Sequence, residues 1–224
     1  MFGSMRKSGS LAQHDISFDA FERVAENVSR ETFQEILSFQ ESFFAWNGRI
    51  NLVAASTEVD FWRRHILDSA QLWRLAPTAT KWIDIGSGGG LPGLVIAFLL
   101  KGRGNGAIDL VESNRKKAGF LQTMIGQYDL PAKAYPIRIE DAAALATLSP
   151  EIVTARALAP LPRLFPMIYP WISMGSRALL HKGRDYRAEV EESTDQWQFD
   201  LIEHPSVTDA DAVILEVSHL GRRI

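Results

Sequence analysis

Hydrophobic positions along the chain change their spacing near residue 76. Before it they recur at helical intervals, as in the run Phe33–Phe44, where apolar side chains follow an i, i+3, i+4, i+7 pattern. Ser29 offers an N-cap for this helix, and Asn47–Gly48 predicts its end. A second helix is expected over Val59–Leu75, because its apolar side chains crowd one side and Pro77 stops it.

After residue 76, short β-rich runs alternate with helical stretches. The expected strands are Trp82–Ile85, Ala107–Val111, Lys133–Ile137, Ile152–Ala155, Arg177–His181, Trp197–Glu203 and Val213–Ser218. The expected helices are Leu94–Leu100, Asn114–Tyr128, Asp141–Leu148, Leu161–Trp171 and Asp185–Gln196. This alternation predicts an α/β, Rossmann-like fold, with a mostly parallel twisted sheet wound on both faces. The last two strands have only a loop between them, which predicts one antiparallel strand at the edge.

Composition sets limits on the class of protein. The chain has 224 residues, of which 46% are hydrophobic, so we expect a disordered polar leader over 1–17, a helical region over 18–76 and one compact domain over 77–224. Cysteine is absent, which excludes disulfides, thiolate metal sites and cysteine nucleophiles, and we predict no metal. No apolar run reaches the roughly 18 residues of a membrane helix. We expect a soluble, cytoplasmic monomer.

The net charge of −3 argues against a protein that coats nucleic acid non-specifically. Contact with RNA through a local basic patch stays open. The basic clusters available for such a patch are Arg63–Arg64, Arg115–Lys117, Lys182 with Arg184 and Arg187, and Arg222–Arg223, together with Arg156 and Arg163. Each cluster by itself is typical of a solvated face.

A glycine-rich turn follows the first predicted strand and precedes a helix. Gly86, Gly88 and Gly90 belong to the run from Asp84 to Gly93, and Leu91 stands where a dinucleotide fingerprint has its third glycine. No Gly-Lys-Ser/Thr follows, so the run is not a phosphate-gripping Walker loop. Because glycines let a ligand lie against the backbone, this turn favours S-adenosylmethionine (SAM), which has no pyrophosphate to seat.

Three further positions fall at the ends of predicted strands. Glu112 lies 26 positions after Gly86, near the ~20-residue separation at which such folds place an acid on the ribose hydroxyls. The loop that contains Ile139 and Glu140 is expected to border the adenine of the cofactor. Arg156 ends the fourth strand, beside the transferred methyl, where it suits an RNA phosphate, a guanine O6 or a nearby acid.

His65, Asp68 and Ser69 lie at helical spacing in the second predicted helix. This pattern is also compatible with a metal pair or a hydrolase relay. No third partner is evident, so we interpret these residues as helix packing or as the wall of the site.

Together these segments resemble the glucose-inhibited division protein B family over about residues 30–220. The matching segments are Trp46–Asn47, Asn51–Leu52, His65–Ser69, Asp84–Gly93, Leu110–Ser113, Arg115–Lys117, Arg138–Glu140 and Ala155–Leu158. Members of that family are bacterial methyltransferases that modify N7 of a guanine in the 16S RNA of the small ribosomal subunit. The resemblance implies SAM contacts from Gly86, Leu91, Ile139 and Glu140, and it implies that Arg156 lies at the mouth of the site.

The implied chemistry needs no general base, because guanine N7 carries a free lone pair. This agrees with the lack of a persuasive catalytic dyad in the sequence. Two alternatives stay open: a SAM-dependent methyltransferase of small molecules or proteins, and, from another class, a non-catalytic nucleotide-binding module or an NAD-dependent oxidoreductase. The missing third glycine counts against the oxidoreductase.

Overall fold

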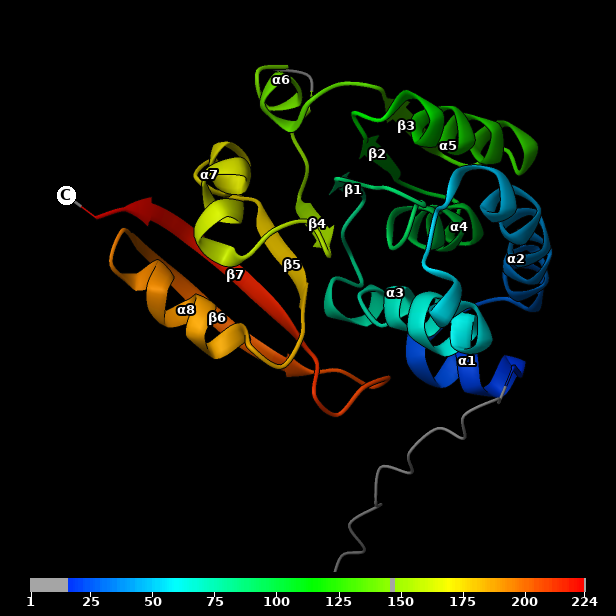
Figure 1. The fold of residues 1–224 in the computed structure, drawn as a ribbon. Helices are drawn as coiled ribbons and strands as arrows, with labels where there is room; N and C mark the ends of the chain where they lie inside the picture. The colour runs from blue at the N-terminus through cyan, green and yellow to red at the C-terminus, as the bar shows by residue number, and fades with distance from the viewer. Residues whose placement is uncertain (1–15, 146–147, 224) are drawn as a thin grey trace, which may run out of the picture.

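A single mixed sheet forms the centre of the molecule (Figure 1). Its strands are β1 (Lys81–Ile85), β2 (Ala107–Val111), β3 (Ala132–Tyr135), β4 (Ile152–Arg156), β5 (Arg177–Lys182), β6 (Trp197–Pro205) and β7 (Val213–Arg222). In the computed structural model, which describes residues 16–145 and 148–223, their order is β3-β2-β1-β4-β5-β7-β6. β1 to β5 are parallel, and β7 runs antiparallel to both β5 and the edge strand β6. The predicted fold class is confirmed.

Helices cover both faces of this sheet. The N-terminal region contains α1 (Phe18–Ala25), α2 (Arg30–Ile50), the 3₁₀ segment η1 (Ala55–Asp60), the π-helical segment η2 (Trp62–Leu67), α3 (Asp68–Ala70) and the 3₁₀ turn η3 (Trp73–Leu75). The helices between strands are α4 (Gly93–Arg103), α5 (Arg115–Gln127), α6 (Ile139–Ala143), α7 (Leu161–Ile172) and α8 (Tyr186–Thr194).

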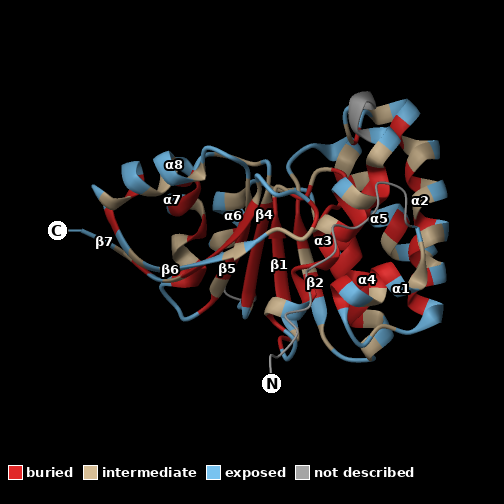
Figure 2. Ribbon diagram, turned by 90° about the horizontal axis from the view of Figure 1, so that it is seen from below, coloured by how far each residue is buried: buried red, intermediate tan, exposed pale blue. Residues whose placement is uncertain are grey.

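Two hydrophobic clusters, one on each face, hold the layers together. One joins the N-terminal helices, α4 and α5 to sheet residues such as Trp82, Ile108 and Leu110. The other joins α6 and α7 to sheet residues such as Ile83 and Val153. These residues point to the opposite face of the sheet, because successive side chains of a strand alternate between its faces. The central strands are therefore buried on both sides, whereas the outer side of α8 and much of β6 are exposed (Figure 2).

The first predicted helix continues further than Asn47–Gly48, so that predicted end was wrong. Ser29 caps its start by accepting a hydrogen bond from the Thr32 amide at 3.1 Å, as expected. α2 ends at Ile50, because Asn51 adopts a left-handed conformation with φ 50°. The buried Asn47 side chain then accepts from the amides of Leu52 and Val53 at 2.7 and 3.0 Å, which satisfies backbone groups just beyond the helix.

The second predicted helix, Val59–Leu75, is not one regular helix but a series of short segments of different pitch. Polar side chains compete with its backbone ladder: Ser69 Oγ donates to the carbonyl of His65 at 2.6 Å, and Gln71 Nε2 donates to that of Asp68 at 3.1 Å. A π-helical stretch over Trp62–Leu67 precedes these residues. The apolar side was nevertheless predicted correctly, since Phe61, Ile66 and their neighbours are buried.

The segment after β3 differs from its prediction in register. The strand ends at Tyr135 instead of Ile137, and α6 covers Ile139–Ala143 instead of Asp141–Leu148. Acidic Glu140 and Asp141 lie in the first turn of α6, where the helix dipole favours negative charge. This interaction stabilises a helix that begins at Ile139, two residues before the predicted start at Asp141. Residues 146 and 147, in the second half of the predicted helix, lie outside the described residues.

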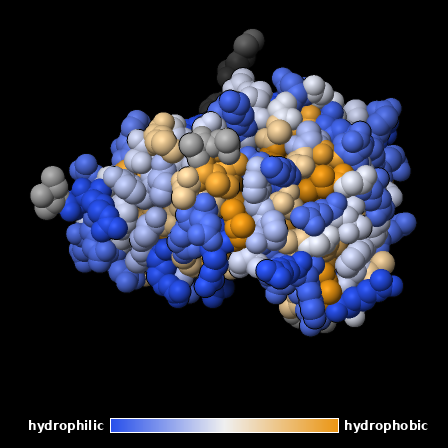
Figure 3. All heavy atoms as spheres, turned by 90° about the horizontal axis from the view of Figure 1, so that it is seen from above, coloured by the Kyte–Doolittle hydropathy of each residue, from blue (hydrophilic) through white to orange (hydrophobic). Residues whose placement is uncertain are grey.

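Residues 1–15 of the expected leader also lie outside the described residues, and Ser17 caps α1 by accepting from the Ala20 amide at 3.2 Å. None of the helices described is both long and apolar enough to cross a membrane. Large exposed apolar side chains are dispersed, as with Val59, Met174 and Ile202. In Figure 3 hydrophobic residues accordingly form small patches between hydrophilic ones on the face shown.

Gly93 allows α4 to approach the sheet closely. A Cβ on this residue would run into Leu110 Cδ2 and would lie 2.7 Å from Asp84 Oδ2. Sequence comparison with the dinucleotide fingerprint places the packing glycine at position 91, where this chain has leucine. The structure shows that Gly93, in the first turn of α4, takes over the close helix–strand contact.

We predict that Gly93→Ala lowers the free energy of unfolding by about 1–3 kcal/mol, because the added methyl overpacks the α4–sheet contact. Gly119→Ala is the matched control, since Gly119 is also helical and a Cβ there meets nothing within 4 Å. That control is expected to gain up to ~1 kcal/mol from helix propensity. Urea denaturation of both variants measures the difference, and equal stability of the two would contradict the packing role of Gly93.

Candidate active site

A cavity of about 380 Å³ opens at the carboxyl ends of the parallel strands. It is lined by Leu52, Val53, Gly86, Ser87, Gly88, Gly89, Leu91, Val111, Glu112, Ser113, Lys117, Ile137, Arg138, Ile139, Glu140, Arg156, Ala157, Leu158 and Met167. Most of them lie at or just after the ends of β1, β2, β3 and β4, whereas Leu52 and Val53 come from the loop after α2 and Met167 comes from α7. The cavity lies where the chain order reverses on either side of β1, which is where ligands bind in open α/β sheets.

The glycine turn forms one wall of this cavity, and its glycines serve different needs. Gly86, Gly88 and Gly90 all have positive φ values, of 67°, 53° and 79°. A Cβ on Gly88 would meet only the carbonyl oxygen of Gly86, at 3.7 Å, so this position leaves the wall open to a ligand. A Cβ on Gly90 would collide with Leu94, and Gly90 is not part of the lining. All the other predicted site residues line the cavity.

Glu112 connects the glycine turn to the end of β2. Its Oε2 accepts a hydrogen bond from the Gly88 amide at 2.8 Å, and its Oε1 accepts from the Asn114 amide at 2.7 Å. The Asn114 side chain caps α5 in turn by accepting from the amides of Lys116 and Lys117. These bonds fix the Glu112 carboxylate at the cavity wall with acceptor capacity left over, since each carboxylate oxygen has two lone pairs.

Asp84 lies beneath the turn and does not line the cavity. Thr154 Oγ1 donates to its Oδ1 at 2.8 Å, whereas Oδ2 has no hydrogen-bond partner among the described residues. Burial raises the pKa of this carboxyl to about 6, although hydrogen bonds from neighbouring groups oppose the rise. A buried carboxylate is costly, so Asp84 makes the stability of this region depend on pH.

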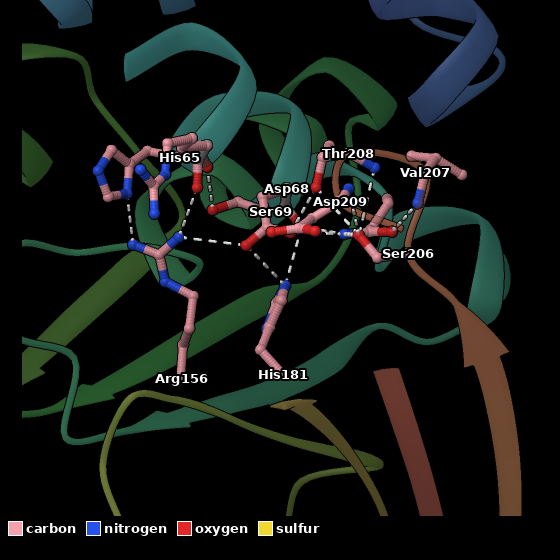
Figure 4. A network of polar contacts seen from close by, with 11 residues as sticks. His65, Asp68, Ser69, Arg156, His181, Ser206, Val207, Thr208 and Asp209 are labelled. Carbon is pink, nitrogen blue, oxygen red and sulfur yellow. Dashed lines mark hydrogen bonds and ion pairs between the residues drawn. The ribbon is translucent and has the colours of Figure 1, made fainter. Parts of the chain in front are cut away.

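Arg156, at the end of β4, is held by residues of the N-terminal helical region (Figure 4). Its Nη1 donates to the carbonyl of Arg64 at 3.0 Å and to Asp68 Oδ2 at 3.2 Å. Its Nη2 lies 2.7 Å from His65 Nδ1. Burial, with the positive charge of Arg156, lowers the pKa of His65 to about 4. The imidazole is therefore neutral at pH 7, and Nδ1 accepts from the guanidinium.

Asp68 joins this arginine to two more segments (Figure 4). Its Oδ1 accepts from Thr208 Oγ1 at 2.9 Å and from Gln71 Nε2 at 2.8 Å, and its carbonyl accepts from His181 Nε2 at 2.8 Å. Burial lowers the pKa of His181, which keeps this imidazole neutral as well. Helical spacing alone predicted only packing or a wall for His65 and Asp68. The structure shows that they bind Arg156 directly.

Sequence reasoning missed the apolar part of the wall. Leu52 and Val53 line the cavity from the loop after α2, and Leu158 and Met167 line it from the segment after β4. The signal available was the Asn47 side chain at the predicted helix end, which accepts from the backbone amides of Leu52 and Val53. Residues so distant in sequence give no periodic pattern that would relate them to the glycine turn.

The cations of the predicted basic clusters, together with Arg138 from the loop after β3, include both paired and unpaired side chains. Arg63 pairs with Asp60, Lys182 with Glu189, Arg184 with Asp211 and Arg187 with Glu203. Lys117 and Arg138 line the cavity, exposed Arg64 follows Arg63, and exposed Arg163 lies one helical turn before Met167. Within 16–145 and 148–223, none of these last four forms an ion pair. Of these four, Lys117 and Arg138 bring unpaired positive charge to the cavity wall.

The strand order and the cavity at the carboxyl ends of β1 to β4 define the Rossmann-like fold of class I methyltransferases. Solved structures of low sequence identity share this fold. The cofactor-bound protein Rv0187 from MTB is 15% identical, with a TM-score of 0.54 over 89% of this chain and 94% of that one. A mutant of MtNAS in complex with S-adenosylmethionine is 15% identical, with a TM-score of 0.53 over 89% and 88%.

Sequence comparison shows the family. The family model for GidB, rRNA small subunit methyltransferase G, matches residues 32–217. Ribosomal RNA small subunit methyltransferase G of Chelativorans sp. (strain BNC1) is 55% identical over 205 residues, which are 92% of this chain and 97% of that protein. The protein of the same name from Brucella canis is 50% identical over 209 residues, or 93% and 98%. The chain belongs to this family.

We predict that Asp84→Asn changes how stability depends on pH. The folded-state pKa of about 6 exceeds the ordinary value of 3.8, so the folded chain holds more protons than the unfolded chain between these values. Stability contributed by the protonated group is therefore lost as the pH rises through this window. Asparagine cannot ionise, so the variant's stability relative to wild type should rise by on the order of 1 kcal/mol between about pH 5 and pH 8.

Urea denaturation at the two pH values measures this difference. Asp141→Asn, which removes an exposed carboxylate from α6, is the control. A constant stability difference between Asp84→Asn and wild type across the window would show that Asp84 does not carry the buried charge.

Proposed function

We propose that this protein transfers a methyl group from S-adenosylmethionine to N7 of a guanine in 16S ribosomal RNA of the small subunit. The observation that carries the proposal is the match to rRNA small subunit methyltransferase G over residues 32–217. It is supported by relatives of that name at 50–55% identity, which are covered over nearly their whole length. The cavity then supplies residues suited to each part of the donor.

The residues of the cavity fit this cofactor. Gly88 leaves the wall free of a side chain, so a ligand can lie against the turn. The Glu112 carboxylate suits the two ribose hydroxyls, which are donors that an acceptor-only group can bind together. Ile139 presents an apolar side chain for the adenine ring, and Glu140 an acceptor for its amino group. Gly86 and Leu91 complete the wall on the side of β1.

When bound, the cofactor supplies a methyl group on a sulfonium, which makes the methyl electrophilic. Guanine N7 would take this methyl with its own lone pair while the methyl–sulfur bond breaks and the neutral thioether leaves, so the chain does not need to remove a proton. The work of the protein is to hold the two reactants in line and to exclude water. Leu52, Val53, Leu158 and Met167 provide an apolar wall for this purpose. Arg156, fixed at the mouth, positions the RNA through guanine O6 or a phosphate.

RNA is expected to approach across the unpaired cations around the cavity. Lys117 and Arg138 line the cavity, and exposed Arg64 and Arg163 lie close in sequence to residues that contact Arg156 or line the cavity, so these cations suit phosphate contacts that give salt-dependent affinity. The target base has to be unstacked or presented in a loop to reach the cavity. We propose that the protein acts in the cytoplasm, where ribosomal subunits are found. Because one chain contains every residue the proposal uses, we also propose that it acts as a monomer.

The direct test uses small ribosomal subunits that lack the modification. Labelled methyl from S-adenosylmethionine should be transferred to them, and chemical cleavage at N7-methylguanine should map the label to a single guanine. Naked 16S RNA serves as a parallel substrate, to distinguish RNA from assembled subunits. Transfer to a different atom or base would contradict the N7 assignment. Absence of transfer despite SAM binding would direct the search to small molecules and proteins.

We predict that Gly88→Val abolishes SAM binding, as measured by calorimetry, while the domain stays folded. A valine at this left-handed position fills the open wall against which the cofactor would lie. Gly104→Val is the matched control: Gly104 has φ 77° and open space around its missing Cβ, but it ends α4 away from the cavity. The control carries similar backbone strain, of about 1–2 kcal/mol, and should keep its SAM affinity. Normal affinity in Gly88→Val would remove the turn from the site.

A further inference from the structure

Arg156 forms part of the wall between two cavities. Besides the larger cavity, a second one of about 240 Å³ opens beside β4 and β5, and both are lined by Arg156 and Ala157. The second cavity is lined on its other sides by residues such as Asp68, His181 and Ser206. A shift of the guanidinium would therefore change both cavities at once, so whatever fixes its position controls the geometry of the site.

The guanidinium is held by one of its edges. Nη1 donates to the Arg64 carbonyl and to Asp68, and Nη2 donates to His65. Nε has no hydrogen-bond partner among the described residues. A guanidinium has five N–H donors in a rigid fork. Clamping both terminal nitrogens from the N-terminal helical region therefore leaves the Nε side available to a ligand.

Asp68 is the only charged group in this clamp, apart from Arg156 itself. Its Oδ2 lies 3.2 Å from Arg156 Nη1, and the two side chains are only 16% and 17% exposed, so solvent screens the pair little. The other two acceptors are a backbone carbonyl and a neutral imidazole, which form weaker hydrogen bonds than a carboxylate does. The charge on Asp68 is thus the strongest determinant of where the guanidinium lies.

We propose that Asp68 is a positioning residue, which acts through Arg156 to align the acceptor RNA with the cofactor. This inference rests on the proposed function. Asp68 lies on α3, outside the sheet, and Arg156 ends β4, so the helical region supplies part of the active-site geometry (Figure 4). Asp68 itself is held from the opposite side, where Thr208 and Gln71 donate to Oδ1.

The two oxygens of Asp68 allow positioning to be separated from stability. Thr208→Val removes the hydroxyl that donates to Oδ1 and that is also bonded to Ser206 Oγ, and it alters neither member of the Oδ2–Arg156 pair. Asp68→Asn removes the charge that holds Arg156 while it retains nearly the same side-chain volume. Both variants disturb the same network, so a purely structural role predicts parallel losses of melting temperature and activity.

The experiment measures methyl transfer to unmodified small subunits, SAM affinity and melting temperature for wild type and the two variants. Asp68→Asn is expected to lower kcat by about tenfold, because small misplacements of a positioning group are costly, with SAM affinity retained. Thr208→Val is expected to keep kcat within about twofold while its melting temperature falls, since its hydrogen bond is worth about 1 kcal/mol.

A double-mutant cycle with Arg156→Ala tests whether Asp68 acts through the arginine. In the Arg156→Ala background, Asp68→Asn should change kcat by less than about twofold, because the group it positions is gone. An undiminished effect in that background, or equal losses of kcat in Asp68→Asn and Thr208→Val, would overturn the inference while leaving the proposed function intact. Wild-type protein that binds SAM but does not methylate the subunits would overturn the proposed function, and the inference with it.

Discussion

The site depends on the parallel pairing of β1 with β2 on one side and with β4 on the other. In this register Ile85 lies opposite Val111, and Asp84 lies opposite Thr154, so the three strands end at the same edge. The glycine turn and Glu112 follow the last residues of β1 and β2, and Arg156 is the last residue of β4. Their proximity is thus a consequence of strand register, and a slip of one residue would point every side chain to the other face.

A second constraint is that α4 begins immediately after the turn and packs closely on the sheet. Gly93 makes that approach possible, and Gly90 leaves room for Leu94 in the same way. With the helix this close, the backbone of Gly86 to Gly89 becomes a wall of the cavity and not a loop projecting into solvent. Glu112 then ties the turn to β2 through the Gly88 amide. Packing and ligand geometry are therefore determined by the same short segment.

Much of the fold could be predicted because its signals are local. Every predicted strand was found, with ends that differ by a few residues, and the apolar faces of the N-terminal helices were correct. The turn glycines and Glu112 were recognisable because the spacing between a strand, a turn and the next strand is nearly fixed in this architecture. All the predicted site residues except Gly90 line one cavity, although their contacts with a cofactor stay predictions.

What could not be predicted depends on contacts between distant segments. In the broken second helix the side chains of Ser69 and Gln71 bind its own backbone, and no periodicity reveals this competition. The role of His65 and Asp68 depends on Arg156, some 90 residues further on. Likewise, the sequence does not reveal that Lys182, Arg184 and Arg187 each have an acid beside them, which the structure shows.

The position of the bound cofactor tests the proposed site most directly. A crystal structure of the protein with S-adenosylhomocysteine, the product form of the donor, would test it. We predict that the ligand occupies the cavity at the ends of β1 to β4, with its ribose hydroxyls on Glu112, its adenine against Ile139 and its sulfur toward Arg156. A ligand bound elsewhere on the chain, or bound in this cavity in the reverse direction with its ribose away from Glu112, would contradict the account.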